Sequence, residues 1–180
     1  MKRTPLFLPI PLGLFLIVIA SWLIGCQQST KDSTSQTNNT YDMPSLFERR
    51  GELAAAVEWP KTKERVDELK QKIKKDPSQV KPRLQLAMIY LSEARITGEH
   101  PYYYPAILTI LDGVLAIDPK NFEATTFKAS VKMSQHQFAE ARTLAQSAQQ
   151  INPDNAYVYG VLVDANVELG NYEEAVAMSD

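Results

Sequence analysis

A 34-residue spacing recurs in the second half of this sequence. Four pairs of residues show it: Pro119 and Pro153, Phe138 and Tyr172, Ala141 and Ala175, and Ala124 and Val158. Self-similarity at a fixed period of roughly 20 to 50 residues is typical of stacked repeats, in which each unit buries its apolar face against the next. An amphipathic bundle without repeats would show a helical period of about 3.6 residues, but it would not produce these four coincident spacings.

The composition favours helices within each repeat. Hydrophobic residues make up 44% of the 180 residues, which is enough to form a core, and only seven residues are glycine. Removal of residues 1–25 would take away Lys2 and Arg3, so the net charge would change from −2 to −4. A mildly acidic chain does not suggest a nucleic-acid-binding protein.

The segment from Leu169 to Ala175, with sequence LGNYEEA, carries the clearest family resemblance. It resembles the tetratricopeptide repeat (TPR), a helix-turn-helix unit with the same period. The resemblance implies that Gly170 forms the turn, that Tyr172 packs at the start of the second helix, and that Ala175 permits close helix contact. It covers residues 80–180 well and residues 45–79 loosely. The implied fold class is all-α, with TPR helix-turn-helix repeats forming a short right-handed superhelix.

An earlier copy of the repeat is longer. Pro77 and Pro119 are 42 residues apart, as are Ala87 and Ala129, so this copy contains eight additional residues. We expect its first helix at 83–91, an inserted loop at 94–101 and its second helix at about 105–117.

A pair of helices is expected before this copy. Residues 60–75 place Val66, Leu69 and Ile73 on one helical face. Residues 46–57 are a plausible partner helix, with Asp42 or Ser45 near its start. The expected domains are a degenerate helical pair at 43–79, a TPR with an insertion at 80–121, a TPR at 122–155 and an incomplete TPR at 156–180.

Residues 1–25 have the pattern of a lipoprotein signal peptide. Lys2 and Arg3 precede an apolar run at residues 12–24. The sequence Leu23, Ile24, Gly25, Cys26 then resembles the lipobox of bacterial lipoproteins, which implies lipidation of Cys26. A transmembrane anchor and an ordinary secretory signal are the alternatives. Prolines at positions 5, 9 and 11 interrupt the helix that an anchor would need.

Residues 26–42 are expected to contain the lipidated cysteine and a flexible polar tether. Residues 27–40 include no apolar side chain, so this stretch cannot form a core. The residue after the cysteine is Gln27, whereas an aspartate there is associated with retention in the inner membrane of enterobacteria. By resemblance, we expect the protein in the bacterial cell envelope, lipid-anchored at the outer membrane and facing the periplasm.

The sequence contains no recognisable catalytic motif. It lacks a glycine-rich phosphate loop, H-E-x-x-H and G-x-S-x-G. His100 and His136 are too few for an imidazole-rich metal site, and His136 is interpreted as an exposed turn residue. The adjacent carboxylates Glu173 and Glu174 face different directions on a helix and are interpreted as a solvated feature. We therefore predict neither an enzyme nor a cofactor or metal requirement.

The resemblance implies a partner-binding surface on the first helices of the repeats, where TPR proteins usually bind other proteins. The corresponding residues here are Gln85, Met88, Ser92, Phe127, Ser130, Ser134, Tyr157, Asp164 and Glu168. TPR chaperone adaptors bind a C-terminal carboxylate with basic residues, but this surface offers Glu123, Asp164 and Glu168. An extended or helical segment with apolar anchors fits better. The alternative is that Met88 and Phe127 simply pack between helices.

Two further surfaces are candidates for contacts. Tyr102 and Tyr103 lie in or beside the expected insertion and could contact a partner, although the loop could also fold its own tyrosines onto the scaffold. Tyr104 aligns with Phe138 and is expected in the core. The basic stretch at 61–75 could contact anionic headgroups, or it could be a solvated helix face.

The predicted function is a membrane-anchored scaffold that binds partner proteins. The alternatives are the N-terminal TPR region of a longer envelope protein or enzyme, and a glycan- or envelope-binding structural protein. Asp180 falls within the second helix of a repeat, so the chain is expected to be incomplete. The alternative is a naturally short protein whose end pairs with a second molecule.

Overall fold

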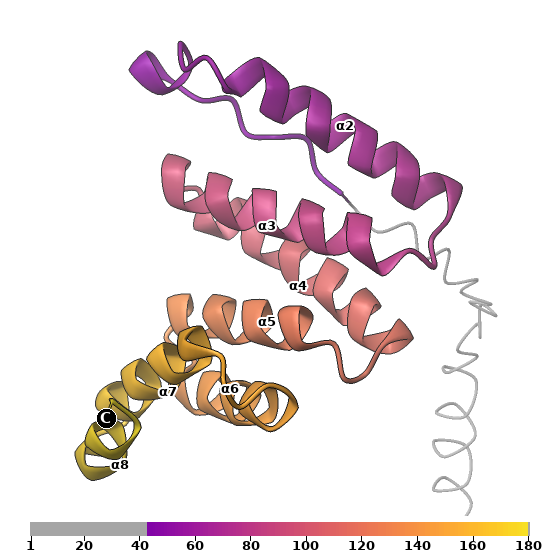
Figure 1. Ribbon diagram of the computed structural model, residues 1–180. Helices are drawn as coiled ribbons and strands as arrows, with labels where there is room; N and C mark the ends of the chain where they lie inside the picture. The colour runs from indigo at the N-terminus through magenta and orange to yellow at the C-terminus, as the bar shows by residue number, and fades with distance from the viewer. Residues whose placement is uncertain (1–42, 180) are drawn as a thin grey trace, which may run out of the picture. The chain divides into compact units, whose positions relative to one another are not determined.

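The computed structural model describes residues 43–179, and this part of the chain is helical with no β-strand (Figure 1). Its elements are η1 (Gly51–Leu53), α2 (Trp59–Lys75), α3 (Val80–Thr97), α4 (His100–Ile117), α5 (Phe122–Ser134), α6 (Phe138–Ile151), α7 (Ala156–Glu168) and α8 (Tyr172–Ser179). The all-α prediction is confirmed. The predicted leader, lipobox, Cys26 and tether lie outside the described residues.

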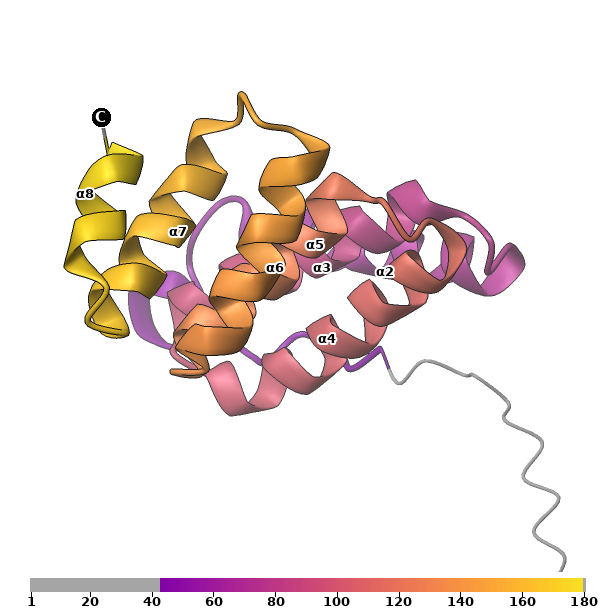
Figure 2. The same cartoon turned by 90° about the horizontal axis from the view of Figure 1, so that it is seen from below.

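Helices α3 to α8 form three antiparallel pairs that stack in chain order, and α2 packs against α3 of the first pair. Each helix packs against the next, and α5 also contacts both α3 and α7 (Figure 2). Helices α5 and α7 begin at Phe122 and Ala156, and helices α6 and α8 begin at Phe138 and Tyr172. The interval is the same in both cases and equals the spacing found in the sequence, so the sequence period is also the period of the structure.

Small residues lie where the helices approach most closely. Ala141 is fully buried on α6, and Ala175 is the buried residue of α8. The expected packing of Tyr172 is wrong, because 65% of its surface is exposed. The described helix that packs extensively against α8 is α7, and this contact covers the Ala175 side and leaves the Tyr172 side open.

The turn inside each helical pair contains a residue with a left-handed backbone. Gly98, His136 and Gly170 have φ values of 77°, 58° and 78°. Glycine adopts this conformation without steric cost, which confirms the predicted turn at Gly170. His136 occupies the equivalent position one repeat earlier, and its exposed side chain confirms its interpretation as a turn residue.

The longer repeat accommodates its additional residues in its helices. Helix α3 has 18 residues against 13 in α5, and α4 has 18 against 14 in α6. The expected loop at 94–101 and the expected start of the second helix near residue 105 are therefore wrong. Helix α4 begins at His100 because Pro101 lies in its first turn, where the missing N–H has no helical partner to lose.

The segment before α2 is not the predicted helix at 46–57. Residues 43–50 have no regular secondary structure and are followed by the short helix η1. Gly51, with a φ of 58°, interrupts a helix here. We call residues 43–50 the N-terminal strap. The hydroxyl groups of Tyr90 on α3 and of Tyr102 and Tyr103 on α4 form hydrogen bonds with backbone groups of the strap, which a helix would otherwise satisfy internally.

The core is largest around α2, α3 and α4. Val66, Leu69 and Ile73 are buried on one face of α2, as the sequence predicted. They join a cluster of large side chains from α3 and α4, among them Leu86, Tyr90, Tyr103, Ile107 and Leu111. A second cluster lies between α5, α6 and α7 and is built largely from alanine, valine and leucine. Together the two clusters support the helices that present the candidate site.

Candidate functional site

A groove runs along the first helices of successive repeats. It consists of two adjoining hollows of about 520 and 380 Å³, which share Met88 of α3 and Phe127 of α5. The larger hollow is also lined by Val80, Lys81, Leu84, Gln85, Asn121 and Glu123, and the smaller by Leu91, Ser92, Arg95, Ser130 and Tyr157. We call these two hollows together the α3–α5 groove.

Six of the predicted partner-binding residues therefore lie together. They are Gln85, Met88, Ser92, Phe127, Ser130 and Tyr157. The repeat geometry explains this arrangement, because equivalent positions on successive first helices face the same side of a helical stack.

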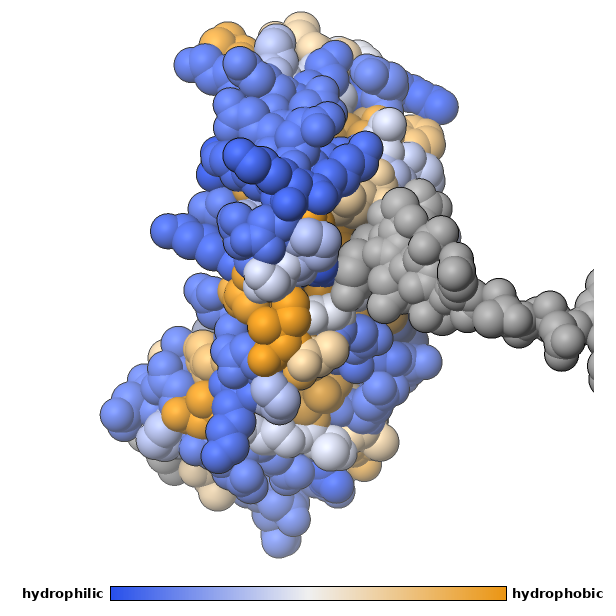
Figure 3. All heavy atoms as spheres, turned by 90° about the vertical axis from the view of Figure 1, so that its right-hand side faces the viewer, coloured by the Kyte–Doolittle hydropathy of each residue, from blue (hydrophilic) through white to orange (hydrophobic). Residues whose placement is uncertain are grey.

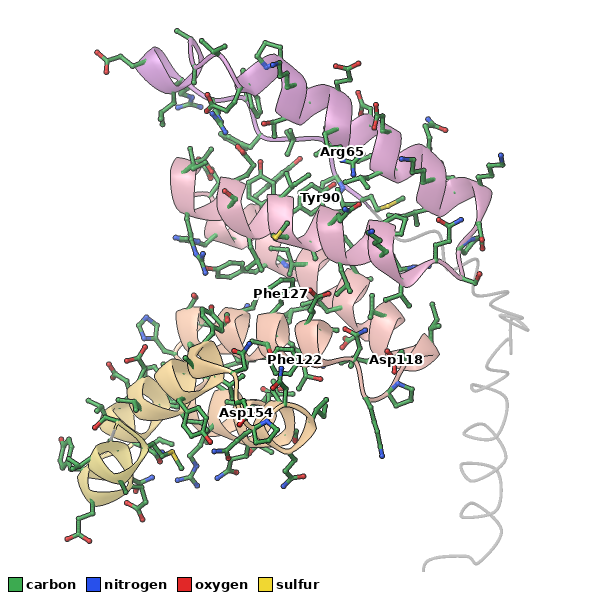
Figure 4. The ribbon with its side chains drawn as sticks, in the orientation of Figure 1. Arg65, Tyr90, Asp118, Phe122, Phe127 and Asp154 are labelled. Atoms are coloured by element: carbon green, nitrogen blue, oxygen red, sulfur yellow. The ribbon has the colours of Figure 1, made fainter. Side chains whose placement is uncertain are left out.

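The apolar part of the groove consists of Met88 and Phe127. Met88 is 53% exposed, although its neighbours Ala87 and Leu91 are buried in the core. Phe127 is half-buried and packs against the larger core cluster, so one part of its side chain contacts the core and another part lines the groove. Figure 4 shows Phe127 between α3 and α5. These two side chains present an apolar surface to any molecule in the groove.

Hydroxyl groups surround one end of this apolar surface. The Ser130 and Tyr157 hydroxyl oxygens are 2.9 Å apart and link α5 to α7. Tyr157 is held at the start of α7, where the Asn155 side chain accepts a hydrogen bond from the Tyr157 backbone N–H. Gln85, at the other end, accepts a hydrogen bond from Arg65 of α2 at 3.0 Å.

The remaining predicted partner-binding residues lie outside the α3–α5 groove. Asp164 lines a separate hollow between α7 and α8. Ser134 and Glu168 are exposed near the C-terminal ends of α5 and α7. Of the three acidic residues expected on this surface, only Glu123 lines the groove, and Lys81 lines the same hollow.

The hydroxyl groups of Tyr102 and Tyr103, two of the predicted partner-binding residues, form hydrogen bonds with the N-terminal strap. Tyr103 is fully buried, and its hydroxyl oxygen accepts a hydrogen bond from the Phe47 N–H at 2.8 Å. The Tyr102 hydroxyl donates to the Ser45 carbonyl oxygen at 2.8 Å, although its side chain is partly exposed. Both residues belong to α4 rather than to a loop. Tyr104 is buried, as expected.

A buried ion pair completes the attachment of the strap. The Arg49 guanidinium donates to both carboxylate oxygens of Glu93, at 3.0 and 2.6 Å, and to the exposed Glu58 carboxylate at 2.8 Å. It also lies 4.7 Å from the centre of the Trp59 ring. The hydrogen bond to Glu93 raises the pKa of Arg49 above its ordinary value. Sequence reasoning missed this pair, because its members are far apart in the chain and no local pattern connects them.

The basic stretch on α2 is a mixed, solvated face. Arg65 pairs with Glu68 at 3.0 Å, and Lys63 lies 3.9 Å from Glu48. Figure 3 shows a predominantly hydrophilic surface with an apolar patch near the middle of the described helices. Within residues 43–179 there is no group of three side chains that could hold a metal ion, and no helix is long and apolar enough to cross a bilayer.

Comparison with known proteins identifies the type of repeat. Residues 132–179 match the family described as tetratricopeptide repeat. The helices form TPR-like repeats. No curated protein sequence matches the chain significantly.

Two solved structures share the fold. The crystal structure of MamA superposes with a TM-score of 0.55 at 19% sequence identity and covers 63% of this chain, while this chain covers 61% of MamA. A mutant of MamA gives a TM-score of 0.50 with the same identity and coverage. At this identity the likeness concerns the fold alone, and the chain spans less than two thirds of the length of MamA.

Proposed function

We propose that this protein is a membrane-anchored scaffold that binds a segment of a partner protein in the α3–α5 groove. The observation that carries the proposal is the partial exposure of Met88 and Phe127 in a groove that no described side chain fills. TPR repeats generally bind other proteins, and residues 132–179 match this family.

The groove can hold a short segment but not a large globular surface. Burial of one apolar side chain against Met88 and Phe127 would contribute about 1.5–3 kcal/mol. The hydroxyl groups of Ser92, Ser130 and Tyr157 lie beside this apolar surface and can bind polar groups of the same segment. An extended or helical segment with an apolar anchor satisfies both requirements.

The membrane attachment is proposed from the leader sequence. Lipidation of Cys26 would place the repeats at a membrane surface, and a polar tether of this length reaches roughly 20 Å by flexible-chain scaling. The proposed location is the bacterial cell envelope, at the outer membrane and facing the periplasm. Anchoring in this way would concentrate the scaffold where envelope partners assemble.

Site-specific photocrosslinking in cells tests the docking groove. A photoreactive amino acid replaces Met88 in one strain and Gln146, which is exposed on α6, in the control strain. We expect a discrete adduct with the Met88 probe that is absent with the Gln146 probe and is lost when Phe127→Glu is added. The same adducts from both probes, or no adduct from either, would contradict binding in this groove.

Metabolic labelling with a clickable fatty acid tests the anchor separately. The natural protein should incorporate the label, whereas Cys26→Ala should abolish labelling and leave an uncleaved precursor. Labelling that persists in Cys26→Ala would show that the lipoprotein interpretation is wrong.

A further inference from the structure

One end of the α3–α5 groove contains a cation with no described counter-charge. Arg95 is exposed on the last turn of α3 and lines the smaller hollow together with Met88, Ser92 and Phe127. Within residues 43–179, no carboxylate forms an ion pair with Arg95. Among the described residues, Arg95 is also the only charged one that lines this hollow, so its charge determines the local potential.

The other end of the groove is balanced. Lys81 and Glu123 line the larger hollow together, and their opposite charges give no net preference. The positive potential is therefore confined to the end that contains Arg95. A basic segment placed there would meet a like charge with no compensating acid, whereas an acidic side chain would meet a complementary one.

The neighbouring polar groups also suit a carboxylate. The Ser92 hydroxyl lines the same hollow as Arg95, together with the linked hydroxyls of Ser130 and Tyr157. A guanidinium group can donate two parallel hydrogen bonds to one carboxylate, and the Ser92 hydroxyl can donate to the same oxygen atoms. The Ser130 hydroxyl donates to the Thr126 carbonyl oxygen, so Tyr157 donates to Ser130, and this pair offers oxygen acceptors to a partner. These groups form a polar end next to an apolar one.

We propose that the α3–α5 groove recognises an extended partner segment that carries an apolar side chain and, about three residues away, an aspartate or glutamate. Met88 and Arg95 are two helical turns apart on α3, which is a distance of about 10 Å along the helix at roughly 1.5 Å per residue. An extended segment covers this distance in about three residues. The inference rests on the proposed function, because it names the chemistry of the partner that the groove binds.

This recognition differs from the C-terminal carboxylate binding that the sequence argued against. It needs one basic residue and an internal acidic side chain, rather than a cluster of basic residues around a chain end. The acidic residues that argued against an anionic ligand were Glu123, Asp164 and Glu168. Of these, Asp164 lines a different hollow, and Glu123 lines the larger hollow together with Lys81 rather than the hollow that contains Arg95.

A charge-reversal selection tests the proposal. A random twelve-residue peptide display library is selected in parallel on the purified full chain in mild detergent and on three variants: Arg95→Glu, Phe127→Glu and Lys75→Glu. Lys75 is exposed at the end of α2, outside the groove, so its variant is the matched charge-reversal control.

The natural chain and Lys75→Glu should enrich peptides with an acidic residue about three positions from an apolar one. Arg95→Glu should enrich lysine or arginine at that position, and Phe127→Glu should enrich no common pattern. The best peptide should then bind roughly fivefold more weakly, by fluorescence anisotropy, when its acidic residue is changed to the amide.

The outcomes separate this inference from the function on which it rests. Enrichment that needs Phe127 but shows the same charge preference on Arg95→Glu would overturn the acidic partner and leave the docking groove intact. Enrichment that is equal on Phe127→Glu, or no enrichment on the natural chain, would overturn both.

Discussion

Residues 43–117 and residues 118–179 both fold into stacked helices, but different interactions stabilise them. The N-terminal region buries large side chains such as Leu86, Tyr90 and Ile107, and it binds an irregular strap through tyrosine hydroxyls and a buried ion pair. The C-terminal region keeps the 34-residue period and relies on small residues such as Ala145 and Ala148. Its first helices begin with asparagine caps at Asn121 and Asn155.

This comparison shows two ways to stabilise a stack of helices. A repeat of constant length can bury its faces with small residues, because each helix meets the next in the same register. Helices α3 and α4 are longer than the helices of the following repeat. The strap and α2 together cover the additional surface. The N-terminal region therefore depends on contacts between residues far apart in the chain, whereas the C-terminal region depends on contacts that recur with the repeat.

The largest expected effect is in the small-residue contacts of the C-terminal region. Ala141→Arg forces a long cation into a fully buried position on α6, so the free energy of unfolding should fall by about 3–5 kcal/mol. Ala139→Arg, at an exposed position of the same helix, is the control and should change it little. Urea unfolding followed by circular dichroism measures both variants. Equal stability of the two would show that the alanines do not determine the packing of this region.

The next largest effect should come from the buried ion pair of the N-terminal region. Glu93→Gln leaves the Arg49 cation buried without its main counter-charge and should destabilise the protein by about 3 kcal/mol. Glu58→Gln removes the exposed carboxylate bound to the same guanidinium and should cost less than about 1 kcal/mol.

A double variant separates the net value of the pair from the cost of breaking it. Arg49→Met combined with Glu93→Leu removes both charges and should recover most of the stability lost in Glu93→Gln. Thermal unfolding of the four proteins is the measurement. A double variant as unstable as Glu93→Gln would mean that the pair itself stabilises the strap.

A smaller effect is expected from the hydroxyl group that binds the strap. Tyr103→Phe leaves the Phe47 N–H without its acceptor and should cost about 1–2 kcal/mol. Tyr104→Phe is the matched control, since the Tyr104 ring is buried but its hydroxyl forms no hydrogen bond with the described residues. Urea unfolding midpoints at neutral pH compare the two variants. Equal midpoints would show that the Tyr103 hydroxyl does not stabilise the strap.

The same tyrosine makes a pH dependence testable. Burial raises the pKa of Tyr103 to about 12 from its ordinary value of 10.0. The unfolded chain then releases this proton at lower pH than the folded chain, so stability is lost as pH rises between about 10 and 12. Tyr103→Phe has no such proton, so its disadvantage relative to the natural chain should shrink in that range. Urea midpoints of both proteins below and above this range are the measurement, and a constant difference would contradict the raised pKa.

The smallest predicted effect is a gain in the C-terminal region. His136 adopts the left-handed conformation that Gly98 and Gly170 adopt in the other two turns. His136→Gly removes this strain and should stabilise the protein by about 0.5 kcal/mol, which is partly offset by the loss of its contact with the Phe138 ring. His136→Ala keeps the strain and is the control. Differential scanning calorimetry should rank glycine above histidine and alanine, and any other order would argue against strain at this turn.

Sequence analysis predicted the parts of the fold that repeat locally. The 34-residue spacing predicted the repeat period, and the resemblance to the TPR predicted the turn at Gly170 and the close helix contact at Ala175. The apolar face of α2 followed from the spacing of Val66, Leu69 and Ile73. The sequence-based prediction was wrong for residues 46–57 and for the loop expected at 94–101. Helix length and the conformation of the strap depend on tertiary contacts, and no local sequence pattern indicates them.

The candidate site also contains some residues that the sequence predicted and others whose position only the structure shows. Family resemblance selected Met88, Phe127 and Tyr157 from their repeat positions, and the structure brings them to one groove. The resemblance could not show that Tyr103 turns inward to the strap, because adjacent helix positions differ by about 100° in direction and only packing decides which is buried.

The sequence by itself determined the repeat period, the helical class and the leader pattern on which the lipoprotein prediction stands, because each of these depends on residues close together or at a fixed interval. Only the tertiary structure decided which distant residues meet. It pairs Arg49 with Glu93, it places Phe127 beside Met88, and it leaves Arg95 without a described counter-charge. The physical reason is that these relations depend on how neighbouring helices rotate and slide against each other, and that is determined by the packing of the whole array.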